Sequence, residues 1–219
     1  MSATSIAVIG LGTFGATVAR DLAAADHHVI GIDVDDDRVN ALADELPNVV
    51  AADARDERAL RDAGVDRCDV VVIAMGEDLE ANIVGAMNAR LLGVRSVWVK
   101  SRSRIHRRIL QRIGVDHVVN PEQDMGHRVA QSIHNPHVTD YMAAGKSQTV
   151  VSLTVPKRLR GRRLAAVDFA QRFGIECLGL EREGKLLRVS QDPELREGDT
   201  LLLFGRRPAL QAFGERECG

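Results

Sequence analysis

The stretch IAVIGLGTFG, residues 6–15, constrains the fold of this chain more than any other segment. Four strand-favouring apolar residues lead directly into Gly10, Gly12 and Gly15, and an alanine-containing helical pattern follows. The next apolar run ends at Asp33, 18 residues after Gly15. This order predicts the first strand, turn, helix and second strand of a dinucleotide-binding α/β fold.

Each glycine of this turn has a distinct expected task. Gly10 permits the tight turn, Gly12 lets the backbone approach a pyrophosphate, and Gly15 lets the helix pack closely on the strand. The helix opens with Thr13 and Phe14. Its unpaired N–H groups and positive dipole are expected to hold the phosphates.

Residues at the other strand ends are expected to line the same crevice, because ligands of open α/β sheets bind at the carboxyl ends of the strands. Asp33, taken to lie at an exposed strand end, would accept hydrogen bonds from ribose hydroxyls and repel a 2′-phosphate. The further candidates are Asp53 and Ala54 near the adenine, Ala74, Met75 and Gly76 against the sugar and phosphates, and Lys100 as a phosphate partner.

Short apolar runs alternate with amphipathic ones from residue 6 to about 119, the pattern of parallel strands joined by crossover helices. The fold class is therefore α/β with a doubly wound parallel sheet. The predicted strands are 6–10, 28–33, 48–51, 69–74, 96–100 and 117–119. The predicted helices are 13–24, 36–46, 57–63, 79–92 and 105–113.

Asn120 can cap a sixth helix that runs to about Ile133, with Pro121 at its first position. Breakers, small residues and polar residues follow, so the domain boundary is placed near Ala144, which gives domains 1–144 and 145–219. Strand-like runs at 149–155, 175–182, 185–189 and 200–204, with a short helix over 164–172, predict a small α+β module.

Composition excludes several classes of protein. Hydrophobic residues make up 45% of the 219 residues, and charged residues make up 27%, so we expect a soluble globular chain. Apolar runs are too short for a membrane span or a secretory leader. Cys68, Cys177 and Cys218 form no C-x-x-C pair, which suits a reducing cytoplasm. A net charge of −2 with 3% aromatic residues argues against nucleic acid, and the basic runs KSRSRIHRRILQR and KRLRGRR are interpreted as solvated faces.

A dehydrogenase also needs an acid or base beside the transferred hydride. The seven histidines fall at positions expected on loops, helix surfaces or strand edges, His106 among them. Tyr141 lies in the expected linker and has no Tyr-x-x-x-Lys partner. An NAD-dependent oxidoreductase therefore stays the alternative to a non-catalytic sensor, and a binding module for some other transporter is a third possibility.

The chain resembles the regulatory gating-ring subunits of Ktr/Trk-type potassium uptake systems, built from RCK N-domains (TrkA-N) and C-domains (TrkA-C). The segments that carry the resemblance are IAVIGLGTFG, VIGIDVDDDRV, AADARDE, VVVIAMGEDLEANI, VWVKSRSRIHRRILQRIGVDHVVNPEQDMG, TVPKRLRGRRL and LREGDTLLLFG. They cover nearly all of residues 6–205.

The resemblance implies a non-catalytic cytoplasmic subunit at the inner face of the cell membrane. Its homodimers would assemble into a ring, an octamer in the simplest case, under an integral-membrane potassium channel that nucleotide occupancy opens or closes. The helix that begins at NPEQDMG would cross to the neighbouring subunit, which agrees with the helical spacing of Met125, Val129 and Ile133.

The resemblance also implies ligands. The carboxylate at Glu122 would join Mg²⁺ or Ca²⁺ near the bound phosphates. Ktr-type subunits commonly carry an arginine for the terminal phosphate of ATP where this chain has Thr13, so NAD(H), ADP, ATP and AMP-type ligands stay open. Arg163 and Arg172 would be the contacts if the C-domain binds an anionic effector such as cyclic di-AMP, for which Glu176 is poorly suited.

Overall fold

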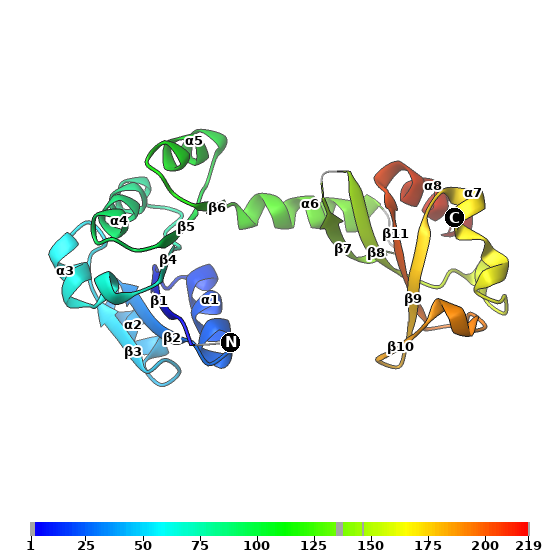
Figure 1. Cartoon of the computed structure of the whole chain (residues 1–219), viewed down its shortest axis with the longest axis horizontal. Helices are drawn as coiled ribbons and strands as arrows, with labels where there is room; N and C mark the ends of the chain where they lie inside the picture. Colours follow the sequence, from blue (N-terminus) through cyan, green and yellow to red (C-terminus); the bar gives the residue numbers. More distant parts are fainter. Residues whose placement is uncertain (1–2, 135–137, 146, 219) are drawn as a thin grey trace. The chain divides into compact units, whose positions relative to one another are not determined.

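The chain folds into two compact units, Met1–Glu122 and Gln123–Gly219. The computed structural model describes residues 3–134, 138–145 and 147–218 (Figure 1). Each unit has its own sheet and its own hydrophobic core. Each is therefore described by itself.

The first unit is built on a six-stranded parallel sheet of order β3-β2-β1-β4-β5-β6. The strands are β1 (Ser5–Ile9), β2 (His28–Asp33), β3 (Asn48–Ala51), β4 (Val70–Ile73), β5 (Ser96–Lys100) and β6 (His117–Val119). The chain adds strands on one side of β1 and then returns to add β4 to β6 on the other. This reversal places a topological switch point at the carboxyl ends of β1 and β4, and it confirms the predicted doubly wound sheet.

The crossover helices begin where polar side chains satisfy their first amides. They are α1 (Thr13–Ala24), α2 (Asp36–Leu42), α3 (Glu57–Asp62), α4 (Leu79–Leu91) and α5 (Arg104–Arg112), with a 3₁₀ turn η1 (Val65–Arg67) after α3. The side chains of Asp35, Asp56, Asp78 and Ser103 accept hydrogen bonds from first-turn amides of α2 to α5. Helix α2 ends at Leu42, before the predicted Leu46, and residues 43–45 form a turn ahead of Pro47.

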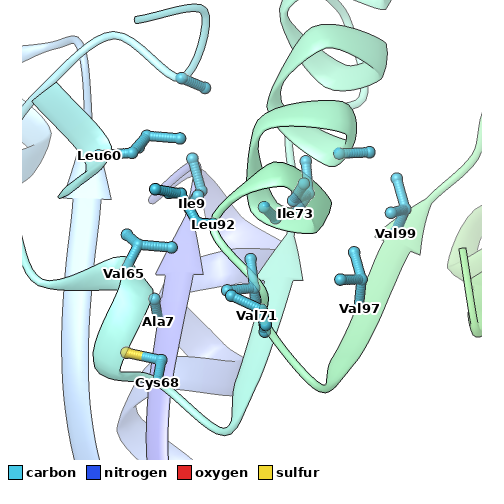
Figure 2. Packing of buried hydrophobic residues seen from close by; sticks show 14 of the residues in the cluster. Ala7, Ile9, Leu60, Val65, Cys68, Val71, Ile73, Leu92, Val97 and Val99 are labelled. Atoms are coloured by element: carbon cyan, nitrogen blue, oxygen red, sulfur yellow. The ribbon is translucent and has the colours of Figure 1, made fainter. Parts of the chain in front are cut away.

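Strand alternation divides the apolar residues of the sheet between two cores. Ala7 and Ile9 face the cluster that includes residues of α3, α4 and α5, whereas Ile6 and Val8 pack with α1 and α2. Figure 2 shows the first cluster, in which Ala7, Ile9, Val71, Ile73, Val97 and Val99 come from three adjacent strands. Burial on both faces explains why these strands are continuously apolar in sequence.

The second unit contains most of α6 (Pro121–His134) and an antiparallel sheet of order β10-β9-β11-β8-β7. Its strands are β7 (Val138–Ala144), β8 (Gln148–Thr154), β9 (Glu176–Arg182), β10 (Lys185–Leu187) and β11 (Thr200–Arg206). Helices α7 (Phe169–Phe173) and α8 (Arg207–Cys218) and the 3₁₀ turns η2 (Lys157–Leu159), η3 (Ala165–Val167) and η4 (Val189–Gln191) complete it. Phe213 of α8 is buried against Phe169 and Phe173, with ring centroids 5.5 and 4.9 Å away. The small α+β module is confirmed.

Three local predictions for the second unit are wrong. Residues expected as linker form β7, which pairs antiparallel with β8, so pairing overrides the weak strand propensity of this segment. Helix α8 was not predicted. The helix expected over 164–172 is divided into η3 and α7 at Asp168, whose φ is +53°.

The compact units divide at Glu122, earlier than the boundary placed near Ala144. Part of the segment between these positions, residues 135–137, lies outside the described residues. The boundary near Ala144 stays a prediction for the end of the N-terminal module taken with its crossover helix.

Candidate functional site

The turn between β1 and α1 can be formed only with glycines at two of its positions. Gly10 has a φ of +94°, and a Cβ atom there would lie 2.7 Å from Cγ of Met75. A Cβ atom on Gly15 would lie 1.8 Å from the carbonyl oxygen of Gly10. The glycines thus allow α1 to start directly against the ends of β1 and β4.

Gly12, the N-cap of α1, has a different environment. Its φ of −65° is open to any residue, and its only neighbour at a Cβ position would be an Arg38 guanidinium nitrogen at 3.9 Å. No side chain of the described residues caps the helix. The first amides of α1 are therefore left without a side-chain acceptor from the N-cap residue, as at helix starts that bind anions.

Asp33 lies at the end of β2 but is not exposed, so that part of the sequence interpretation is wrong. Its side chain is 5% exposed. One carboxylate oxygen accepts hydrogen bonds from the Leu11 amide at 2.6 Å and from Arg38 at 3.5 Å, and the other accepts from the Asp35 amide at 3.0 Å. Asp33 thus fixes the glycine turn, and its hydrogen bonds to ribose hydroxyls stay a prediction.

Arg38 is a residue of this site that the sequence analysis missed. It lies on α2, and its guanidinium is within 3.5 Å of Asp33 and 3.4 Å of Asp35. Its position five residues after Asp33 was a usable signal, because arginines near this acid accommodate a 2′-phosphate in related folds. Repulsion of a 2′-phosphate by Asp33 is therefore weaker than expected from the carboxylate alone.

The end of β3 carries a carboxylate that already has a partner. Arg55 forms a two-pronged ion pair with Asp53, with Nη2 2.7 Å from Oδ2, and these hydrogen bonds hold the pKa of Asp53 below its ordinary value. The following Ala54 is buried, and its carbonyl oxygen accepts from Nδ2 of Asn88 at 2.9 Å. Of the two predicted residues, Asp53 thus forms an exposed ion pair, and Ala54 is held by a hydrogen bond to its carbonyl oxygen.

Lys100 brings together the ends of β4 and β5 and the start of α6. Its Nζ atom lies 2.6 Å from Oε1 of Glu122 and 5.6 Å from the centroid of the Phe14 ring. A Cβ atom on Gly76 would lie 3.2 Å from Cε and Nζ of Lys100. The Ala74 amide is bonded to the carbonyl of Ile9 at 2.7 Å, which keeps this strand end beside β1. A cation at this position suits a phosphate held at the start of α1.

Glu122 is the predicted metal ligand. Its side chain is 64% exposed, and the hydrogen bond from Lys100 lowers the pKa of its carboxyl group. The described residues contain no group of three or more His, Cys, Asp or Glu side chains arranged to hold a metal ion. Glu122 alone therefore offers a single carboxylate, and a cation there would need phosphate oxygens as its other ligands.

Two buried side chains behind this crevice were also missed. Asn82 is fully buried and His106 is 3% exposed, and they are hydrogen-bonded to each other at 3.1 Å. The sequence placed His106 on a helix surface, which is wrong. A signal for its burial was available, because His106 lies four residues before Leu110 and shares the buried face of α5 with it.

The two arginines named as possible effector contacts in the second unit each have a carboxylate partner within the chain. Arg172 pairs with the buried Glu217 at 2.8 Å, and Arg163 pairs with Asp192 at 3.7 Å. Burial raises the pKa of the free thiols of Cys68 and Cys177 to about 11, so neither is a thiolate at neutral pH. The side chains of Tyr141 and Cys218 lie outside the described residues. Within the described part of the chain, no helix combines the length and apolarity needed to cross a bilayer.

Comparison with known proteins agrees with this architecture. The Ktr system potassium uptake protein C of Bacillus subtilis (strain 168) is 32% identical over 212 residues, which are 96% of each chain. The Ktr system potassium uptake protein A of Vibrio alginolyticus is 33% identical over 205 residues, or 93% of each chain.

Solved structures share the fold at low identity. The GsuK RCK domain matches all of this chain and 48% of its own, with a TM-score of 0.69 and 18% identity. The GsuK channel bound to NAD matches all of this chain and 40% of its own, with a TM-score of 0.67 and 18% identity. This chain thus spans less than half the length of each of these two solved chains. Residues 6–121 match the TrkA-N domain and residues 149–216 match the TrkA-C domain, and the chain belongs to the family of two-domain TrkA-N/TrkA-C proteins that includes the Ktr system potassium uptake proteins.

Proposed function

We propose that this chain is a nucleotide-sensing regulatory subunit that gates a potassium uptake channel. The observation that carries the proposal is the start of α1, where Gly12 leaves the helix without a side-chain cap and the buried Asp33 accepts from the neighbouring Leu11 amide. The two Ktr relatives support potassium uptake as the process. The NAD-bound GsuK channel supports an adenine nucleotide as the ligand for this fold.

In this proposal the phosphates bind at the first turn of α1. The amides of Gly12, Thr13 and Phe14 donate to the phosphate oxygens, and Asp33 accepts from ribose hydroxyls. Lys100 then adds a positive charge from the other side of the crevice. Thr13 supplies a hydroxyl group and no charge, so NAD(H) and ADP compete well with ATP.

The loops after the neighbouring strands complete the proposed site. Asp53 and Ala54 would border the adenine, and Ala74, Met75 and Gly76 would border the sugar and phosphates. The close approach of Gly76 to Lys100 favours this arrangement, because both then face the same phosphate group.

A divalent cation would bind only after the Lys100–Glu122 pair opens. Mg²⁺ or Ca²⁺ prefers oxygen ligands, and Glu122 together with phosphate oxygens would supply them. Lys100 would then turn from the carboxylate to the phosphate. The metal is thus proposed as a partner of the nucleotide and not as a resident ion.

The proposal includes assembly into homodimers and then a ring, with eight subunits as the expected number. Met125, Val129 and Ile133 on α6 are 54%, 50% and 74% exposed, and a second copy would cover them. The ring would act in the cytoplasm, under the membrane channel. Ala144 would end the module that this crossing helix completes.

Hydride transfer is the alternative function for the same crevice. The named relatives are uptake proteins, which favours a regulatory role. Incubation of the protein with NAD⁺ and common alcohols or hydroxy acids tests for hydride transfer. Steady formation of NADH would overturn the regulatory proposal.

The direct test measures binding first and gating second. Calorimetric titration with NAD, NADH, ADP and ATP is expected to give micromolar or tighter binding of at least one nucleotide. Flux of K⁺ through a Ktr-type membrane subunit, reconstituted in vesicles together with this chain, should then change when that nucleotide is added. Binding without any change in flux would retain the ligand and reject the gating role.

A further inference from the structure

A buried polar chain lies directly behind the crevice and joins its two phosphate-facing loops. Nδ2 of Asn82, on α4, donates to the carbonyl oxygens of Met75 at 2.5 Å and Lys100 at 3.2 Å. Met75 lies in the loop after β4 and Lys100 is the last residue of β5, and these two strands are adjacent in the sheet. One amide group thus sets the spacing of two loops that the proposed nucleotide would touch.

His106 fixes the orientation of that amide. Its Nε2 atom lies 3.1 Å from Oδ1 of Asn82, and its Nδ1 atom lies 3.3 Å from the backbone amide of Arg102. A backbone N–H can only donate, so Nδ1 accepts and the proton is on Nε2. Nε2–H then donates to Oδ1, which leaves Nδ2 of Asn82 for the two carbonyls.

We propose that Asn82 and His106 are positioning residues of the nucleotide crevice, which hold the loop 74–76 and Lys100 at the separation that a bound phosphate requires. The inference rests on the proposed nucleotide site. It adds two residues that do not touch the ligand, and it makes ligand affinity depend on the neutral state of His106.

We call the hydrogen bonds that join His106, Asn82 and the two loops the clamp. Low pH is expected to break it. A proton on Nδ1 of His106 would face the N–H group of Arg102, so two donors would meet and the bond would be lost. The groups that face the ring are Asn82 from α4 and Arg102 from the loop before α5, whereas Ser103 accepts a hydrogen bond from the backbone amide of His106. Burial, and then the charge of Arg102, lower the pKa of His106.

The sign of the pH effect follows from that direction. A histidine with a lowered pKa in the folded protein is neutral above its ordinary pKa of about 6.5 and contributes its full stability there. The contribution falls as the pH drops below that value. Nucleotide affinity depends on the folded protein alone, so it is expected to fall only as the pH drops through the lowered pKa of the folded state. The loss at pH 5.5 stays below about tenfold, because even a histidine with the ordinary pKa of about 6.5 would be about one-tenth neutral there.

The test uses NAD, because its pyrophosphate does not titrate between pH 5.5 and 8, and measures affinity by calorimetry across that range. Asn82→Asp keeps the shape but removes both donated bonds, so affinity at pH 7.5 should fall by about 10- to 30-fold. His106→Gln keeps a donor for Asn82 and cannot titrate. It should bind within about threefold of the parent at pH 7.5, with a flat pH profile.

His28→Gln is the matched control, since His28 is exposed at the start of β2. The strand starts lie at the opposite end of the sheet from the crevice. It should keep the parent's pH profile. If Asn82→Asp does not fold, as judged by circular dichroism, the His106→Gln profile decides. Unchanged NAD binding in folded Asn82→Asp, or the parent's profile in His106→Gln, overturns the clamp and leaves the nucleotide site intact. A parent that binds none of NAD, ADP or ATP overturns both proposals.

Discussion

Helices α1 and α4 follow the two strands at the switch point of the same sheet, yet they begin in opposite ways. Asp78 caps α4, and its carboxylate accepts from the Ala81 amide at 2.9 Å. Gly12 caps α1 with no side chain at all. Both helix ends carry unpaired amides and a positive dipole, so the difference decides which one is open to an anion.

The comparison shows that the candidate anion site at the start of α1 depends partly on the absence of a capping side chain. Asp78 satisfies α4 internally and would repel a phosphate. Three further helices of this unit, α2, α3 and α5, are capped like α4. Among the five crossover helices α1 to α5, the start of α1 is thus the exception.

The largest expected effect tests whether α1 must begin so close to β1. Gly15→Ala places a methyl group 1.8 Å from the Gly10 carbonyl oxygen, so the free energy of unfolding should fall by about 3 kcal/mol. Urea denaturation measures it. Gly126→Ala on α6 is the control, because no atom lies near its Cβ position, and it should raise stability by about 0.5–1 kcal/mol. A Gly15→Ala protein as stable as the parent would contradict the close packing.

The next change converts the start of α1 into one like α4. Gly12→Asp should cap the helix and leave stability equal or a few tenths of a kcal/mol higher. The carboxylate would occupy the amides and repel phosphate, so nucleotide affinity should fall by about 100-fold. Gly12→Ala adds only a methyl group and should lose less than Gly12→Asp. Calorimetry with NAD and ADP compares them, and equal affinity of the aspartate variant and the parent would reject the phosphate site at α1.

Asp33 is expected both to stabilise the glycine turn and to bind the ligand, whereas Asp35 caps α2. Replacing each of them tests this difference. Asp33→Asn should cost about 1–3 kcal/mol of stability, because the Leu11 and Asp35 amides lose a charged acceptor. It should also weaken NAD binding by about tenfold. Asp35→Asn, which alters the cap of α2 nearby, should leave NAD affinity unchanged. Thermal melts and titrations of both variants check this, and equal effects on affinity would assign Asp33 a purely structural role.

The smallest effect concerns the Lys100–Glu122 pair. Glu122→Gln keeps the exposed helix start, so stability should change by only a few tenths of a kcal/mol. With its partner neutral, Lys100 can turn to the phosphate, and metal-free ADP affinity should rise a few-fold. Enhancement of ADP binding by Mg²⁺ or Ca²⁺ should disappear. Titrations with and without each metal decide, and an enhancement that persists in Glu122→Gln would exclude Glu122 as the ligand.

Sequence by itself determined the first unit well. Glycine spacing, strand alternation and capping acids are local properties, so the βαβ order, the turn at Gly10 and the start of α1 followed from neighbouring residues alone. The strand ends were also found, because parallel topology brings them to one edge of the sheet. The order of strands and helices along the first unit was therefore readable from local sequence, whereas the pairing of its strands is long-range.

Only the tertiary structure decided which polar groups already have partners. Asp33 is buried by the glycine turn, Asp53 is paired with Arg55, and Lys100 reaches Glu122 across the sheet edge. Asn82 and His106 are 24 residues apart in sequence, and no periodicity links them. Strand β7 likewise depends on pairing with β8. Such pairings arise from distance in space, and that distance is fixed only when the chain has packed.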